Sequence, residues 1–277
     1  MDTWNEGGGL AKTAGNGVAT APASVVARTI EHLRGAIDGA AENREPFAHI
    51  RLVDAFPADV YSEMLIAMPA KKDYRRMSGR ARSPRGDVRT KVDLFPECIR
   101  NLPAEKRWVW EAVSQSLRST QVREAFMRRL APGLERRFGT GYARVGMYPL
   151  PVLTRDLSGY RIGVHPDTRW KGMTIQIYLP RDRSIEHVGT VFHKRSGDGS
   201  YQVCSRMPFW PNTGYAFAVG EDTHHSVDTV GQEVRTRDSI LLTYYVERTL
   251  LEMAQNRWKR LGNFLLAKAR GISRRSF

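Results

Sequence analysis

Two short segments of the chain carry residues that could bind a metal ion. In the first, His165-Pro-Asp167 places an imidazole and a carboxylate two positions apart, directly after a run that alternates like a strand, so that both side chains face the same way. In the second, far downstream, two more imidazoles stand together at His224-His225. Two imidazoles and one carboxylate are the ligands that suit Fe(II) while leaving positions open for a substrate and oxygen. The pattern therefore predicts a metal site with an open face.

Two arginines follow the second segment. Arg235 and Arg237 stand ten and twelve positions after His225 and lead directly into Asp238-Ser-Ile-Leu-Leu-Thr-Tyr-Tyr. A guanidinium at the mouth of a strand can pair bidentately with one carboxylate of a bound dicarboxylic acid. Both arginines have the same strand parity, so either could face a pocket.

Short strands must position these residues. From about residue 142 the sequence consists of β-like runs separated by glycine, proline and aspartate, at the spacing expected of a small antiparallel barrel or jelly roll. We therefore expect His165 and Asp167 to follow one strand and His225 to precede another. The predicted strands are Ala143–Tyr148, Tyr160–Val164, Met173–Leu179, Gly189–His193, Tyr201–Cys204, Tyr215–Val219 and Ser239–Val246.

Helical spacing of apolar residues surrounds this core. Ser24 is the expected N-cap of the first helix, and an alternating stretch from Phe47 to Val53 predicts one additional strand. The fold class that follows is α+β, with a mainly β jelly-roll core and flanking N- and C-terminal helices. The predicted helical stretches are 25–37, 57–68, 103–130 and 250–265.

The order of these motifs resembles the Fe(II)- and 2-oxoglutarate-dependent dioxygenases, especially their prolyl-hydroxylase-like branch. In that family His-x-Asp is followed by a distal His and then, a short distance on, by an Arg or Lys at the start of the last core strand. This chain has His165-Pro-Asp167, His225 and Arg235 or Arg237 in the same order. The resemblance covers the segment 143–245. It implies a double-stranded β-helix, bound Fe(II), 2-oxoglutarate as cosubstrate and O2 as oxidant.

The resemblance assigns roles to individual residues. His165 and Asp167 match as catalytic metal ligands. His225 matches the distal ligand better than His224, because the family commonly has an aromatic residue before this His and a small or acidic residue after it. Arg237 matches the cosubstrate anchor better than Arg235, because an alternating apolar strand follows it.

Further positions of the resemblance concern the cosubstrate pocket. Tyr178 matches a position that often donates its hydroxyl to the distal carboxylate of 2-oxoglutarate, and Thr174 lies on the same strand face. Tyr148 matches a tyrosine that can line the same pocket, although ordinary barrel packing explains it equally well. Because Asp167 is present, the site lacks the vacancy that a halide occupies in the halogenating branch, so hydroxylation is the implied outcome.

The charge of the chain is unevenly distributed. There are 43 Lys and Arg against 29 Asp and Glu, a formal net charge of +14, and the segments 71–91 and 248–277 each carry +7 of it. Such a surplus attracts an anionic partner such as nucleic acid, an acidic glycan or a membrane surface. The alternative is a solvated basic surface.

Residues 70–91 are expected to form a mobile basic loop. The C-terminal segment has the pattern of a basic amphipathic helix, which could lie on an anionic membrane or pack on the core.

The composition also bears on the compartment. Two cysteines are too few for a disulfide framework. No apolar run approaches the roughly 20 residues that span a bilayer, and the first residues do not have the pattern of a secretory signal. We expect a cytoplasmic protein, peripheral at the inner face of the membrane if the C-terminal helix binds lipid.

These observations predict one oxygenase domain. Residues 1–21 are expected to be a flexible tail, and 22–277 a single domain with helical support over 22–141, a jelly-roll core over 142–247 and a basic helix over 248–277. The implied function is hydroxylation of an unactivated C–H bond of a small molecule or an anionic glycan.

Three other functions are compatible with such a core. A protein or peptide hydroxylase has the same motifs. A nucleic-acid demethylase usually carries a second arginine a few residues after the first, and Ser239–Tyr245 contains none. A non-catalytic jelly-roll binding module is the alternative from another class, and the intact His, Asp, His and Arg argue against it.

Overall fold

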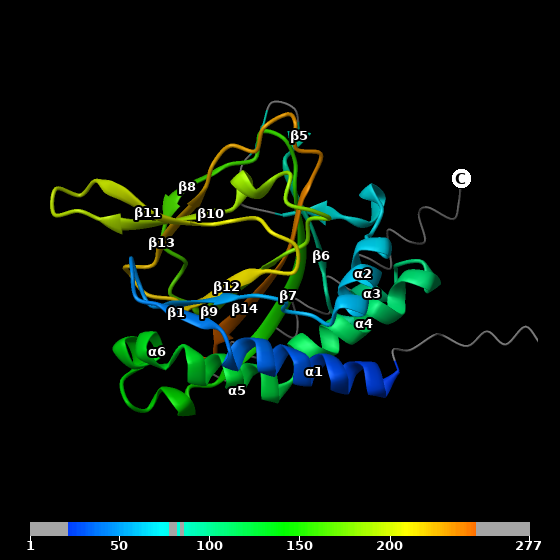
Figure 1. Cartoon of the computed structure of the whole chain (residues 1–277), viewed down its shortest axis with the longest axis horizontal. Coiled ribbons are helices and arrows are strands. Elements are labelled where there is room, and N and C mark those ends of the chain that lie inside the picture. Colours follow the sequence, from blue (N-terminus) through cyan, green and yellow to red (C-terminus); the bar gives the residue numbers. More distant parts are fainter. Residues whose placement is uncertain (1–21, 78–81, 84–85, 248–277) are drawn as a thin grey trace, which may run out of the picture.

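The computed structural model of the chain describes residues 22–77, 82–83 and 86–247, and most of its strands lie in two sheets (Figure 1). The large sheet has the order β1-β2-β12-β9-β14-β7-β6-β3 and the small sheet the order β11-β10-β13-β8, while β4 (Arg82–Ser83) and β5 (Gly86–Asp87) pair with each other. The large sheet contains β1 (Ala41–Asn43), β2 (His49–Leu52), β3 (Arg75–Arg76), β6 (Arg89–Asp93), β7 (Met147–Asp156), β9 (Lys171–Tyr178), β12 (Gly214–Ala218) and β14 (Arg237–Val246). The small sheet contains β8 (Ile162–His165), β10 (Thr190–Arg195), β11 (Tyr201–Met207) and β13 (His224–Val227).

The strands from β7 to β14 pass back and forth between the two sheets. β7, β9, β12 and β14 belong to the large sheet, β8, β10, β11 and β13 to the small one, and their pairings are antiparallel. This is the topology of a double-stranded β-helix, so the predicted jelly-roll core is confirmed. The segment His224–Val227, which was expected to precede a strand, is itself the strand β13.

The central strand β9 of the large sheet is buried on both faces, and it separates two kinds of side chain. Along β9, Met173, Ile175 and Ile177 belong to the apolar core beneath the helices. The residues between them, Thr174 and Gln176, together with Tyr178, face the space between the two sheets. The period of two that favours a strand therefore also places polar side chains inside the barrel.

Helices cover the outer face of the large sheet (Figure 1). The first helix begins at Ala23 after Pro22, with no side-chain cap, so the expected N-cap at Ser24 is wrong. The helical stretch predicted at 103–130 is divided into two helices, and Ser119 caps the second through the backbone N–H of Val122. The helices are α1 (Ala23–Asp38), α2 (Ala58–Ile66), α3 (Pro96–Ile99), α4 (Ala104–Leu117), α5 (Thr120–Arg129) and α6 (Ala131–Phe138), with short 3-10 turns at Lys71–Asp73, Tyr142–Arg144 and Glu186–Val188.

The strand predicted at Ala143–Tyr148 is wrong in its bounds. β7 runs from Met147 to Asp156 and passes through Pro149 and Pro151. The carbonyl of Pro151 accepts a hydrogen bond from the N–H of Leu94, just beyond the end of β6. The ring nitrogens of both prolines therefore point to the side of β6. Pro151 cannot return a hydrogen bond to Leu94, and the carbonyl of Leu94 accepts from the Ser114 hydroxyl at 2.6 Å instead.

The segment 70–91 is not simply a mobile basic loop. Its described residues include β3 and the start of β6, which extend the large sheet beyond β7. Arg89 pairs in register with Asp156 and is buried. The region 22–141 thus contributes strands as well as helices, among them β2 within the predicted strand at Phe47–Val53.

Two of the predicted segments lie outside the described residues, namely the tail at 1–21 and the basic helix at 248–277. None of the described helices combines the length and apolarity that crossing a membrane requires.

Candidate metal centre

Strand pairing brings the three predicted metal ligands together. His165 ends β8 and lies in register with His225 on β13, while Asp167 follows two residues later. One ligand atom from each of His165, Asp167 and His225 lies within 4.8 Å of the others. Two strands that are distant in sequence therefore form one potential metal-binding group at the end of the barrel.

Backbone contacts fix the tautomers of the two imidazoles. The Nδ1 atom of His165 lies 2.9 Å from the carbonyl of Gly163, and that of His225 lies 3.0 Å from the carbonyl of Thr223. A carbonyl can only accept, so each Nδ1 carries the proton and the lone pair resides on Nε2. Burial also lowers the pKa of His225 to about 4, which keeps its ring neutral at physiological pH. Both features suit a metal-binding imidazole.

The third member, Asp167, is held by two residues of β9. Lys171 Nζ lies 2.5 Å from Oδ1, and the Thr174 hydroxyl donates to Oδ2 at 2.7 Å. Burial would raise the pKa of Asp167, but the charges of Lys171 and His225 and the hydrogen bonds from Lys171 and Thr174 together outweigh it, so the pKa is lowered. The carboxylate is therefore ionised, as a metal ligand must be.

A cavity of about 140 Å³ opens beside the three residues, far more than the roughly 10–15 Å³ that one water needs. The inner faces of β6, β7, β9 and β14 line it together with β8 and β13. Its charged lining residues, besides Asp167, are the four cations Arg89, Lys91, Lys171 and Arg237. The chemistry of the lining therefore favours an anionic ligand.

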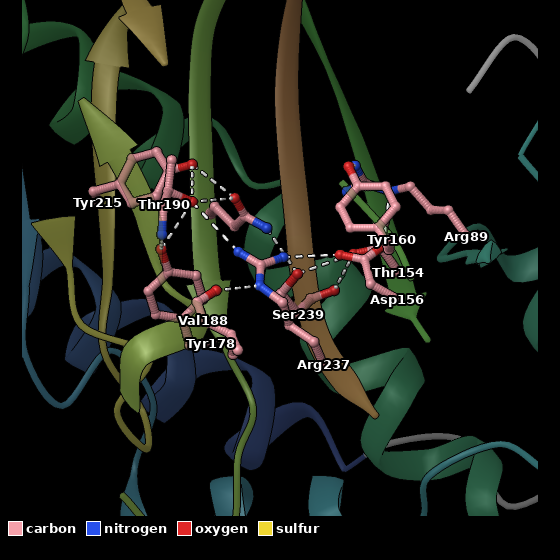
Figure 2. A network of polar contacts seen from close by, with 11 residues as sticks. Arg89, Thr154, Asp156, Tyr160, Tyr178, Val188, Thr190, Tyr215, Arg237 and Ser239 are labelled. Carbon is pink, nitrogen blue, oxygen red and sulfur yellow. Dashed lines mark hydrogen bonds and ion pairs between the residues drawn. The ribbon is translucent and has the colours of Figure 1, made fainter. Parts of the chain in front are cut away.

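Arg237 is the first residue of β14 and lines the same cavity. Its side chain is 0% exposed and donates to the carbonyl of Val188 at 2.7 Å and to Asp156 at 2.8 Å (Figure 2). The guanidinium also lies near the Thr190 hydroxyl and against the rings of Tyr178 and Phe209. The arginine is thus rigidly held, and one of its hydrogen bonds goes to a carboxylate of the chain itself.

The structure separates the two ambiguous pairs. Arg235 is exposed and lines a different surface hollow with Glu233. Because β14 begins only at Arg237, Arg235 is not on the strand and does not share the face of Arg237. His224 packs against Tyr201, with ring centroids 4.9 Å apart, and is not part of the metal-binding group. His225 and Arg237 are the members that face the cavity.

The other three predicted pocket residues differ in what they contact. Tyr178 is buried and bonds with Thr190 at 3.0 Å, next to Arg237. Thr174 donates to Asp167 and therefore positions that carboxylate. Tyr148 does not line the cavity and stacks on Tyr245, which does.

Several cavity residues were not identified from the sequence. Arg89 and Lys91 come from β6, within the segment interpreted as a mobile loop, and Lys171 begins β9. Tyr215 on β12 donates to Gln176, its register partner on the neighbouring strand β9, at 2.7 Å. The signal for β6 was the alternation of charged residues in Arg89-Thr-Lys91-Val-Asp93, which was hidden by the surrounding charge.

A residue of the helical layer bonds to the connection that carries Asp167. Arg137 on α6 donates to the carbonyls of Lys171 at 2.5 Å and of Val219 at 2.6 Å, and also to the carbonyl of Arg169. These carbonyls belong to the connection between β8 and β9 and to the end of β12. The backbone around Asp167 is therefore tied to α6.

Comparison with known proteins gives likenesses of fold. No protein-family model matches the chain, and no curated protein sequence matches it. A prolyl-4-hydroxylase from Pseudomonas putida is 16% identical, with a TM-score of 0.47 over 78% of this chain and 99% of that one. A 2OG-Fe(II) oxygenase family protein from Burkholderia pseudomallei is 17% identical, with a TM-score of 0.43 over 71% of this chain and 84% of that one. The epimerase SnoN, solved with Fe3+, alpha ketoglutarate and nogalamycin RO, is 12% identical, with a TM-score of 0.42 over 78% and 83%.

Proposed function

We propose that the chain is an Fe(II)- and 2-oxoglutarate-dependent oxygenase that hydroxylates an unactivated C–H bond of a small molecule or an anionic saccharide. One observation carries the proposal: a two-histidine, one-carboxylate group opens onto a cavity that also contains a fully buried arginine. His165, Asp167 and His225 would hold the iron, and Arg237 would bind the distal carboxylate of 2-oxoglutarate. Iron and 2-oxoglutarate together supply the oxidative chemistry, with O2 as oxidant.

The side chains around this site bind, orient and exclude water. The Nδ1–H groups of His165 and His225 donate to backbone carbonyls and so fix the ring planes. Thr174 orients the carboxylate of Asp167. Tyr178 and Tyr215 close the cavity on the side of Arg237 with buried rings and satisfied hydroxyls, which limits access of water to the reacting groups.

The lining of the cavity supports an anionic substrate. Arg89, Lys91 and Lys171 accompany Arg237 there, against the single lining carboxylate of Asp167. Three carboxylates already pair with these cations, namely Asp156 with Arg89 and Arg237, Asp167 with Lys171, and Asp93 with Lys91. A metal ion held by Asp167 would displace Lys171 from that carboxylate, and the freed ammonium group would attract a substrate with its own negative charge, such as a carboxylated, sulfated or phosphorylated sugar.

The proposal is tested first at the metal. Under anaerobic conditions the protein should bind one Fe(II), and added 2-oxoglutarate should produce the visible charge-transfer band of the chelate. The variants His165→Ala, Asp167→Ala and His225→Ala should each abolish the band, because each removes a ligand. His224→Ala should retain it, since His224 packs on Tyr201. Loss of the band in His224→Ala with retention in His225→Ala would overturn the ligand assignment.

Succinate release then identifies the substrate class. A panel of anionic sugars, neutral sugars, amino acids, peptides and alkylated oligonucleotides should give the strongest stimulation with an anionic small molecule or saccharide. Stimulation by peptides alone would favour a peptide hydroxylase, and stimulation by oligonucleotides a demethylase. Iron and 2-oxoglutarate binding without turnover of any kind would favour a binding module.

A further inference from the structure

A single buried carboxylate, Asp156, lies between two buried arginines. Arg89 on β6 and Arg237 on β14 both pair in register with Asp156 on β7, so the three residues form a row across the large sheet. Arg89 Nε lies 3.1 Å from one carboxylate oxygen, and Arg237 Nη1 lies 2.8 Å from the other. Figure 2 shows the two arginines on either side of the aspartate. Their side chains are 8% and 0% exposed, and that of Asp156 is 0% exposed.

This row carries more positive than negative charge. Two guanidinium groups stay protonated in proteins, and one carboxylate balances only one of them. Their other hydrogen-bonding partners are neutral, namely the Tyr160 hydroxyl for Arg89, and the Val188 carbonyl and Thr190 hydroxyl for Arg237. A buried charge without a partner is costly. The row therefore favours a ligand that brings one negative charge to the cavity.

Arg89 is the source of that surplus. Without it, Arg237 and Asp156 would form a neutral pair, and a neutral pair attracts a second carboxylate only weakly because Asp156 repels it. With Arg89 engaged on the other oxygen of Asp156, the row keeps a net charge of +1. Both arginines line the same cavity as the metal-binding group.

We propose that Arg89 is a specificity-determining residue of the cosubstrate site. By sharing Asp156 with Arg237 it keeps one positive charge in the cavity, and this charge selects a 2-oxo acid with a distal carboxylate. The inference rests on the proposed function, and it assigns a binding role to a residue of the N-terminal half of the chain.

Calorimetric titration of the anaerobic, Fe(II)-loaded full-length protein tests this role. The two ligands are 2-oxoglutarate and 2-oxopentanoate, which has the same carbon chain without the distal carboxylate. Arg89→Gln should weaken 2-oxoglutarate binding by about ten- to a hundredfold, as expected for losing an interaction with a charged group, and leave 2-oxopentanoate binding unchanged. Arg89→Lys, which keeps the charge, should lose much less. Equal weakening of both ligands would overturn the proposal.

A matched control separates the row from the general charge of the protein. Arg155 is the neighbour of Asp156 on β7, but it points to the other side and pairs with Asp238 at 2.7 Å. Arg155→Gln removes one positive charge and breaks one ion pair, as Arg89→Gln does. It should leave 2-oxoglutarate affinity near the wild-type value. An equal loss in both variants would overturn the assignment to Arg89.

A double variant tests the charge balance directly. Arg89→Gln combined with Asp156→Asn restores the net charge of +1 on Arg237, so 2-oxoglutarate affinity should recover most of what Arg89→Gln loses. No recovery in a double variant with native near-ultraviolet circular dichroism would overturn the charge explanation.

If the wild-type protein binds Fe(II) but not 2-oxoglutarate, the proposed function itself fails. If the wild type binds 2-oxoglutarate and only Arg237→Gln weakens it, the role of Arg89 fails alone.

Discussion

Two buried carboxylates on the inner side of the same barrel differ in what surrounds them. Asp156 contacts two arginines, whose charges are permanent and whose positions are fixed by strand pairing. Asp167 contacts one lysine and one threonine, and the imidazoles of His165 and His225 lie beside it. Asp156 has two positive charges against its single negative charge. Asp167 has only one, and a divalent metal ion that also binds the two imidazoles could displace that lysine. Residue type and burial are alike in the two places, so the neighbours alone decide that one region suits an anion and the other a metal.

Among these tests, removing Asp156 should cause the largest loss of stability. Asp156→Ala leaves two buried guanidinium groups without a carboxylate, and breaking a buried ion pair in this way costs about 3–5 kcal/mol. The free energy of unfolding from urea denaturation should fall by that amount. A loss of less than about 0.5 kcal/mol, the range of an ordinary surface substitution, would show that water or another group neutralises the two arginines once Asp156 is gone.

Removing Arg237 should affect the cosubstrate more than the metal. Arg237→Gln takes away the buried partner of the ligand carboxylate, and a loss of about 3–5 kcal/mol corresponds to two to three orders of magnitude in the 2-oxoglutarate requirement. Fe(II) affinity, measured by anaerobic titration, should stay near the wild-type value. Arg235→Gln is the control, because Arg235 is exposed and lines another hollow. The reverse pattern in the two variants would transfer the role to Arg235.

Removing Lys171 should have an intermediate effect that depends on the metal. Lys171→Gln leaves Asp167 with Thr174 alone, so the metal-free protein should lose about 1–3 kcal/mol of stability, as for a charged group that loses a hydrogen bond. Because Lys171 and a metal ion compete for the same carboxylate, adding a divalent metal should raise the melting temperature more in the variant than in the wild type. An equal rise in both proteins would show that no competition exists.

The smallest effect is expected at the surface, where Arg28 on α1 pairs with Asp59 on α2. Both side chains are at least half exposed, so the coupling in a double-mutant cycle should lie close to the error of the denaturation experiment. The hydrogen bond from Arg28 lowers the pKa of Asp59 to about 2. A lowered carboxyl pKa stabilises the fold above the ordinary value of 3.8, so this small coupling should vanish as the pH falls from 3.8 towards 2.

The jelly roll and the His165–Asp167 half of the potential metal-binding group were predictable because both depend on local patterns, whereas His225 was assigned through the order of motifs along the whole chain. Alternation over Met173–Leu179 reflects one apolar and one polar face, and His165-Pro-Asp167 lies in one stretch of chain. The bounds of β7 were not predictable, because prolines normally end a strand and are tolerated here only where β6 stops. That condition is set by a neighbouring strand from another part of the sequence.

Arg89 could not be identified for a related reason. The inward face of β6 carries Arg89, Lys91 and Asp93, which is the reverse of the usual rule that apolar side chains point inward. The rule fails because this face borders a polar cavity and carboxylates on other strands neutralise part of its charge. The partner of Arg89, Asp156, lies 67 positions later in the sequence, and no local pattern connects them.

The attachment of Arg137 to three backbone carbonyls has a practical consequence for engineering the protein. The jelly-roll strands would lose this clamp if they were excised without α6, and the connection that presents Asp167 would keep only its bonds to β14 and β9. A minimal fragment should therefore retain the helical layer. Substitutions in α6, on the opposite side of the sheet from the cavity, offer a way to tune metal affinity without altering a ligand.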